Sequence, residues 1–149
     1  MQAMLKRCFT LVEIMIVVAI ITLLAAIGIP GLLRSRLTGN EATAIRGVKS
    51  IATACEVYRA AQISPIYPAT LNNLTNVSPP YISSLGPGDP VTKAGYTYTL
   101  TGTENSFYVI ANPTQPGSTG IRSFCVNETG NLYSQTSSMA GGCSGSVLN

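Results

Sequence analysis

The sequence FTLVEIMIVVAIITLLAAIGIPGLL, residues 9–33, is an apolar stretch of 25 residues that is long enough for a membrane-spanning helix. Glu13 is the one charged residue in it. As an α-helix the stretch is about 38 Å long, enough to cross a hydrocarbon core of roughly 30 Å with some tilt. A carboxylate near the bilayer centre costs on the order of 2.5–3.5 kcal/mol. Glu13 lies near one end, where the cost is smaller, but its charge still needs a partner. We therefore interpret Glu13 as a functional residue.

A basic pair, Lys6 and Arg7, stands just before the apolar stretch. A secretory signal peptide also begins with a basic and then an apolar segment, but its cleavage follows the apolar segment at small residues. Here no A-x-A site leads into a change of composition, and residues 34–62 continue as helix-like sequence. We therefore expect the apolar stretch to be retained.

The run KRCFTLVE from Lys6 to Glu13, followed by an apolar helix and then Pro30, resembles the class III signal of type IV prepilins and type II secretion pseudopilins. The resemblance covers about 25 residues and is highly specific. In that family a membrane peptidase cuts just before the Phe and methylates the new amine. The resemblance implies cleavage between Cys8 and Phe9 and N-methylation of Phe9. The residue before the cut is normally glycine, and Cys8 departs from that pattern.

The resemblance also implies roles in assembly for Glu13 and Pro30. Glu13 matches the acidic residue five places after the cut, and Pro30 matches the helix-bending proline. Cleavage frees the amine of Phe9, which becomes a buried cation in an assembled fibre. Glu13 of a neighbouring subunit can pair with it, so that each charge removes the desolvation cost of the other. Pro30 removes one backbone hydrogen bond, so we expect it to kink the helix or let it melt locally.

Residues 34–62 predict an amphipathic helix that continues the apolar one. The apolar side chains of its expected buried stripe are Leu37, Ala44, Ile45, Val48, Ala52 and Cys55. The other face carries Arg34, Arg36, Glu41, Arg46, Lys49, Glu56 and Arg59. Because only one side is apolar, a downstream part of the chain must cover it.

Residues 63–95 contain six prolines and are expected to form a connecting loop with one short helical turn at residues 70–74. Seven apolar side chains are expected to attach this loop to a core: Ile66, Tyr67, Leu71, Leu74, Tyr81, Ile82 and Leu85.

Residues 96–149 predict an antiparallel β head of about four strands, at residues 96–100, 106–111, 122–126 and 132–134. The Ser/Gly-rich tail from residue 135 is expected to be held by Cys143 alone. The fold class is therefore α+β: a pilin-like fold in which a long N-terminal helix, transmembrane in its first half, packs on a small antiparallel meander. The stretch SFCVNETGNLY also resembles, more loosely, the globular head of bacterial pilins.

The four cysteines, Cys8, Cys55, Cys125 and Cys143, form no CxxC pair, so the sequence supports no zinc or thioredoxin-like site. Cys125 and Cys143 lie in a segment that should be exported, and an oxidising compartment favours a disulfide between them. We interpret Cys55 as a small buried hydrophobe on a helix. No metal or cofactor is expected.

Charge and composition argue against other functions. From residue 41 onward the chain has five cations and five anions, so charge gives no argument for nucleic acid binding. The chain has no histidine, no paired carboxylates and no Gly-rich phosphate loop, so we do not expect an enzyme.

Together these features predict a structural subunit of a type IV pilus-like filament, assembled by packing of the N-terminal helices after cleavage of a leader at residues 1–8. The expected partners are further copies in a helical filament, the prepilin peptidase and an inner-membrane assembly platform. The subunit is expected to cross the inner membrane once before assembly and to lie in a cell-surface or periplasmic filament afterwards. Two alternatives stay open: a pseudopilin of a type II secretion system, and a single-pass anchored binding domain.

Overall fold

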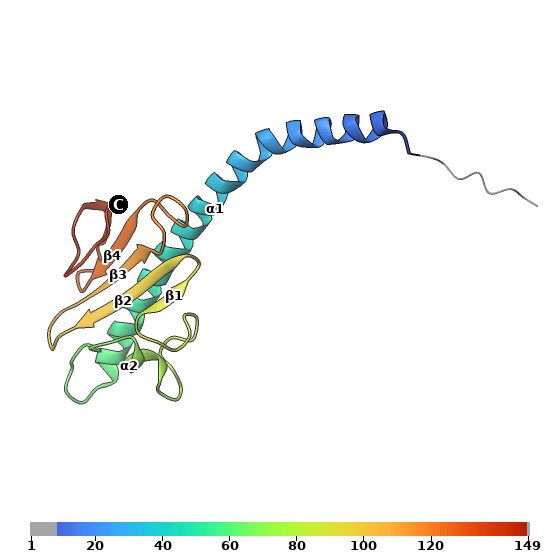
Figure 1. Ribbon diagram of the computed structural model, residues 1–149. Coiled ribbons are helices and arrows are strands. Elements are labelled where there is room, and N and C mark those ends of the chain that lie inside the picture. The colour runs from blue at the N-terminus through green and yellow to red at the C-terminus, as the bar shows by residue number, and fades with distance from the viewer. Residues whose placement is uncertain (1–8, 149) are drawn as a thin grey trace, which may run out of the picture. The chain divides into compact units, whose positions relative to one another are not determined.

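The computed structural model describes residues 9–148, which separate into two compact units with the boundary between Ser35 and Arg36. The elements, which Figure 1 traces along the chain, are α1 (Leu11–Ala61), α2 (Asn72–Thr75), β1 (Val91–Lys93), β2 (Tyr96–Gly102), β3 (Phe107–Pro113), β4 (Ser123–Asn127), β5 (Leu132–Gln135) and β6 (Ser146–Leu148).

The helix α1 contains 51 residues and stays helical through Pro30. Its N-terminus is capped by Thr10, whose Oγ1 and carbonyl oxygen both accept from the backbone N–H of Glu13, at 3.3 and 3.1 Å. Thr10 and Glu13 have the spacing of a capping box, in which a Thr before the helix pairs with a Glu three residues later. The predicted long helix is confirmed, and in this structure Pro30 does not melt it.

The strands of the described residues form one six-stranded antiparallel sheet, in which each strand pairs with the next one along the chain. The pairing registers align one row of residues across the whole sheet: Val91, Tyr98, Ala111, Phe124, Ser134 and Ser146. The first four of these belong to the core that α1 covers. The sheet therefore presents alternate residues to the helix, as the Tyr96-Tyr98-Leu100 alternation predicts.

The expectation of about four strands needs correction, because β1 and β6 add one strand at each edge. β1 lies inside the segment expected to be a loop, and β6 lies inside the Ser/Gly-rich tail. Each contains three residues, too few to show a periodic pattern in the sequence. Their strand conformation comes from pairing with β2 and β5, which is a tertiary effect.

From residue 36 onward α1 lies on one face of the sheet (Figure 1) and buries Ala44, Val48, Ile51, Ala54 and Cys55. The residues that α1 buries differ in part from the predicted stripe. Ile51 and Ala54 were not expected in it, whereas Leu37, Ile45 and Ala52 are only half-buried.

The connecting loop is attached largely as predicted, through the buried side chains of Tyr67, Leu71, Leu74, Ile82 and Leu85. Tyr81 is half-buried and meets Tyr58 edge to face, with ring centroids 5.4 Å apart. The expectation for Ile66 is wrong, because its side chain is 41% exposed.

Glu41 joins α1 to the loop before β4, although the sequence places it on the exposed face. Its Oε1 accepts from the backbone N–H groups of Ile121 and Arg122, at 3.1 and 3.2 Å. Its Oε2 accepts from Nε and Nη2 of Arg122, at 3.1 and 2.8 Å. Next to it, Asn40 Nδ2 donates to the carbonyl oxygen of Thr119 at 2.9 Å, so two consecutive helix residues hold this loop.

The electrostatic state of Glu41 follows from this geometry. Burial by itself raises the pKa of the carboxyl, but the hydrogen bonds from Arg122 and Ile121 and the charge of Arg122 outweigh burial. The pKa of Glu41 therefore lies below its ordinary value of 4.5. A lowered pKa means that ionised Glu41 stabilises the fold above about pH 4.5, and that this stabilisation is lost as the pH falls through the lowered pKa.

We predict that Glu41→Gln lowers the free energy of unfolding of the head at pH 7 by about 1.5–3 kcal/mol, because it removes charge-assisted hydrogen bonds. The difference from the wild type should narrow as the pH falls below 4.5 and then through the lowered pKa of Glu41. Denaturant titrations of the full chain in a neutral detergent, at several pH values, measure both effects. The matched control is Glu128→Gln, which neutralises an exposed carboxylate and should change stability little. A constant gap between Glu41→Gln and the wild type from pH 7 to pH 3 would contradict the argument.

Candidate functional site

The surface of the first unit is apolar on every side. Its large apolar side chains are between 46% and 76% exposed in the single chain: Phe9, Leu11, Val12, Ile14, Met15, Ile16, Val17, Val18, Ile20, Ile21, Leu23, Leu24, Ile27, Ile29, Leu32 and Leu33. Among the described residues, α1 is the one helix long and apolar enough to cross a membrane. Apolar exposure on this scale marks a membrane or protein interaction surface.

Phe9 and Glu13 lie at the start of this surface. The side chain of Phe9 is 74% exposed. Glu13 is exposed in the first turn of α1, and its carboxylate has no partner within residues 9–148. The N-terminus of a helix favours a negative charge, so the carboxylate stands at the end where it is best tolerated. The cleavage prediction also involves Cys8, which lies outside the described residues.

Pro30 stands between Gly28 and Gly31 on the same helix. A Cβ atom at either glycine would meet no other atom within 4 Å, so neither glycine is required by packing inside this chain. Small residues of this kind let another helix approach closely in a membrane. Packing within the described chain therefore does not explain either glycine.

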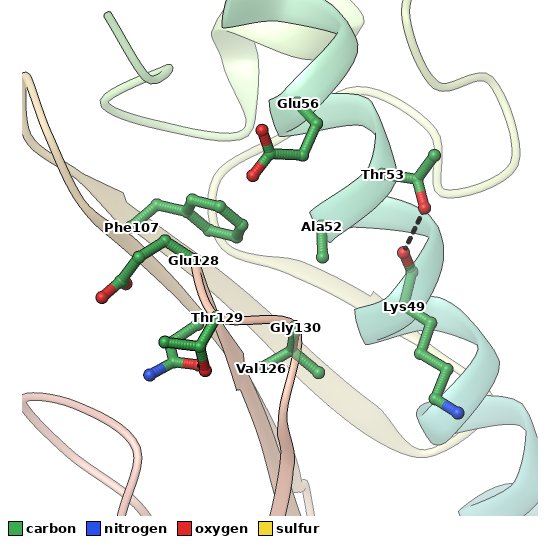
Figure 2. Close-up of a pocket in the computed structure, with 10 residues that line it drawn as sticks. Lys49, Ala52, Thr53, Glu56, Phe107, Val126, Glu128, Thr129 and Gly130 are labelled. Carbon is green, nitrogen blue, oxygen red and sulfur yellow. Dashed lines mark hydrogen bonds between the residues drawn. The ribbon is translucent and has the colours of Figure 1, made fainter.

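In the second unit, a cleft of about 460 Å³ separates α1 from the β4–β5 turn. Figure 2 shows Lys49, Thr53 and Glu56 on the helix side of this cleft. Phe107, Val126 and the turn residues Glu128, Thr129 and Gly130 line the other side (Figure 2). Thr53 Oγ1 donates to the carbonyl oxygen of Lys49 at 3.0 Å, and Glu56 Oε1 accepts from the hydroxyl of Tyr67 at 3.0 Å. The cleft thus holds charged side chains but no nucleophile beside a base.

The predicted disulfide between Cys125 and Cys143 is present, with Cα atoms 5.2 Å apart. It covers the sheet face opposite α1, where Ile110, Cys125 and Met139 form a second, smaller buried cluster. Asn112 also holds the tail, because its side chain donates to Met139 O at 3.0 Å and accepts from Met139 N–H at 2.9 Å. The expectation that Cys143 alone holds the tail is therefore wrong: this amide pair and β6 hold it as well.

Cys55 is unpaired and fully buried on α1. Burial raises the pKa of its thiol to about 12, with a smaller contribution from the charge of Glu56. Such a thiol is protonated at neutral pH and unreactive. The structure agrees with its interpretation as a small buried hydrophobe, and the described residues hold no group of three His, Cys, Asp or Glu side chains that could bind a metal.

Residues 6–29 match the prokaryotic N-terminal methylation motif. No curated protein and no solved structure matches the chain. The chain therefore carries the class III signal typical of type IV pilins and pseudopilins, followed by a long apolar helix, as its resemblance implies. The motif and the fold point to a pilin-like structural protein rather than an enzyme, and the apolar helix is consistent with an inner-membrane anchor.

We predict that reducing the Cys125–Cys143 bond destabilises the head by about 3 kcal/mol, the chain-entropy value for a loop of about this length. Cys125→Ser with Cys143→Ser should reproduce the loss. Thermal melts of the full chain in neutral detergent, with and without reductant, provide the measurement. The matched control is Cys55→Ala, which keeps the bridge and should stay sensitive to reductant. A double Ser variant that still responds to reductant as the wild type does would refute the assignment.

Proposed function

We propose that this chain is a subunit of a type IV pilus-like filament, built by packing residues 9–33 of many copies against one another after leader cleavage. The observation that carries the proposal is the first unit itself. It is apolar around its whole circumference and has one unpaired carboxylate at its start, within a matched N-terminal methylation motif.

The apolar surface is covered in a different way before and after assembly of the subunit. Before assembly, lipid covers the exposed side chains of residues 9–33, and the subunit crosses the inner membrane once. After assembly, the same side chains of neighbouring copies cover one another in the filament core, and the heads lie outside. Equal numbers of cations and anions from residue 41 onward avoid strong repulsion between crowded heads.

Glu13 supplies specificity in this assembly. Its carboxylate lacks a partner in the chain, and the prepilin peptidase creates a new amine when it releases Phe9 from the leader. Pairing of Glu13 with the Phe9 amine of a neighbouring copy neutralises both charges in the core and sets the axial stagger between copies. An inner-membrane assembly platform would then move each paired subunit out of the bilayer.

A pseudopilin of a type II secretion system carries the same signal and would use the same helix packing, in a shorter periplasmic filament. Neighbouring genes distinguish the two: pilus retraction and alignment genes accompany a pilus subunit, and secretin-linked secretion genes accompany a pseudopilin. A single-pass anchored binding domain would not need the carboxylate of Glu13. The filament yield of Glu13→Gln therefore also distinguishes that function from a filament subunit.

We predict cleavage between Cys8 and Phe9 and N-methylation of Phe9. The intact mass of the protein, purified from cells that contain prepilin peptidase, measures both changes. The matched variant is Cys8→Gly, which restores the usual residue before the cut and should be processed at least as fast. A chain that keeps MQAMLKRC in both forms would contradict the cleavage site.

We predict that Glu13→Gln inserts into the membrane but yields few filaments. The loss of charge leaves a buried amine uncompensated, which costs about 3–5 kcal/mol. Gln keeps the backbone N–H that donates to Thr10 Oγ1, so a loss of filaments in this variant reports pairing rather than helix capping. Thr10→Ala, which removes the cap and keeps the charge, should assemble better than Glu13→Gln. Sheared filament yield, normalised to membrane-inserted subunit, is the measurement, and wild-type yield from Glu13→Gln would rule out the pairing.

A further inference from the structure

A separate pocket of about 230 Å³ lies in the head, between α1 and the first two strands. Two cationic side chains line it: Arg46 from α1 and Lys93 from β1. Hydroxyl groups of Thr43, Ser50, Ser84 and Tyr98 line it as well. No acidic side chain lines this pocket, whereas the cleft of Figure 2 contains two carboxylates.

The two cations lack a carboxylate partner. Arg46 is exposed and makes no ion pair or hydrogen bond with its side chain among the described residues. Lys93 Nζ donates to the carbonyl oxygen of Ser84, which holds its ammonium at the pocket but leaves two donors unused. Two like charges that face one cavity repel each other, and an anion between them would remove that cost.

Tyr98 adds a hydroxyl donor to the lining of the pocket. Its side chain is 1% exposed, yet its hydroxyl makes no hydrogen bond to any described residue. Burial raises the pKa of Tyr98 to about 12, so the hydroxyl stays protonated and able to donate. Gly47 leaves room for the Tyr98 ring, because a Cβ atom at that position would lie 2.8 Å from Tyr98 Oη and 2.6 Å from Cε1. The described residues contain no buried side-chain nitrogen or oxygen atom without a hydrogen-bond partner, so this hydroxyl reaches the open space of the pocket, where a ligand can accept from it.

We propose that this pocket binds a compact oxyanion, a phosphate or a carboxylate, held by the charges of Arg46 and Lys93 and by a hydrogen bond from Tyr98. Ser50 on α1 and Ser84 in the connecting loop can add hydroxyl donors. The volume is below the usual 300–1,000 Å³ of sites for drug-sized ligands, which favours a small ion over a nucleotide. The site lies in the head and does not depend on the proposed filament.

The test uses the full chain in a neutral maltoside detergent. Inorganic phosphate, acetate and chloride are titrated at equal ionic strength, and backbone amide chemical shifts of residues 43–50 and 93–98 are followed. We expect saturable shifts with phosphate, acetate or both, and none with chloride. Saturation by phosphate alone assigns the site to phosphate groups, and saturation by acetate alone assigns it to carboxylates.

Three variants locate the site. Lys93→Gln and Arg46→Gln should each raise the dissociation constant by about tenfold, the loss of one charge-assisted hydrogen bond. Tyr98→Phe should raise it by a smaller factor. The matched control is Lys49→Gln, an exposed cation on the same helix that does not line the pocket, and it should leave the dissociation constant unchanged.

Two results would overturn the proposal. One is the absence of saturable shifts with both oxyanions. The other is an equal loss of affinity in Lys49→Gln and Lys93→Gln, which would show general attraction by the cationic helix face. If Tyr98→Phe does not fold, Lys93→Gln still decides the question, because Lys93 is an exposed residue at a sheet edge.

Discussion

Two kinds of apolar surface on one helix determine the rest of this structure. Residues 9–33 of the chain are apolar on every side, and residues 44–55 are apolar on one side. Water cannot cover either without a large cost in free energy, so each must find apolar partners. The sheet and the connecting loop cover the second surface inside the chain. Within the described residues nothing covers the first, and in the function that we propose lipid and then other copies cover it.

Two glutamates on α1 illustrate the same division. Glu41 receives four hydrogen bonds from Ile121 and Arg122, so its charge is satisfied inside the head. Glu13 receives none at its carboxylate from the described chain, although it would lie in an apolar environment. The first charge therefore serves to join helix and sheet. The second charge has no partner in the described chain. The proposed filament contact therefore explains the presence of Glu13 better than a simple membrane anchor does.

The sheet depends on having both of its faces covered. α1 and the connecting loop cover one face, and the disulfide-bonded tail covers part of the other through Ile110, Cys125 and Met139. At Gly47 the ring of Tyr98 occupies the space that a side chain of the helix would fill. This close contact also places the Tyr98 hydroxyl beside two cations, so a feature of core packing creates a polar pocket in the head.

Four features could be predicted from the amino-acid sequence: the long helix, the α+β class, the Cys125–Cys143 pair and the N-terminal signal. These are local or compositional features, such as periodicity over many residues, a contiguous motif and a pair of cysteines in an exported segment. Three other features could not be predicted and depend on the packing of the folded chain: the strands β1 and β6, the burial of Ile51 and Ala54, and the Glu41–Arg122 contact. A strand of three residues carries no periodic signal, and two charges 81 residues apart carry no sign of their pairing. Such features arise only when the sheet packs on the helix, because their stabilising partners are remote in the chain.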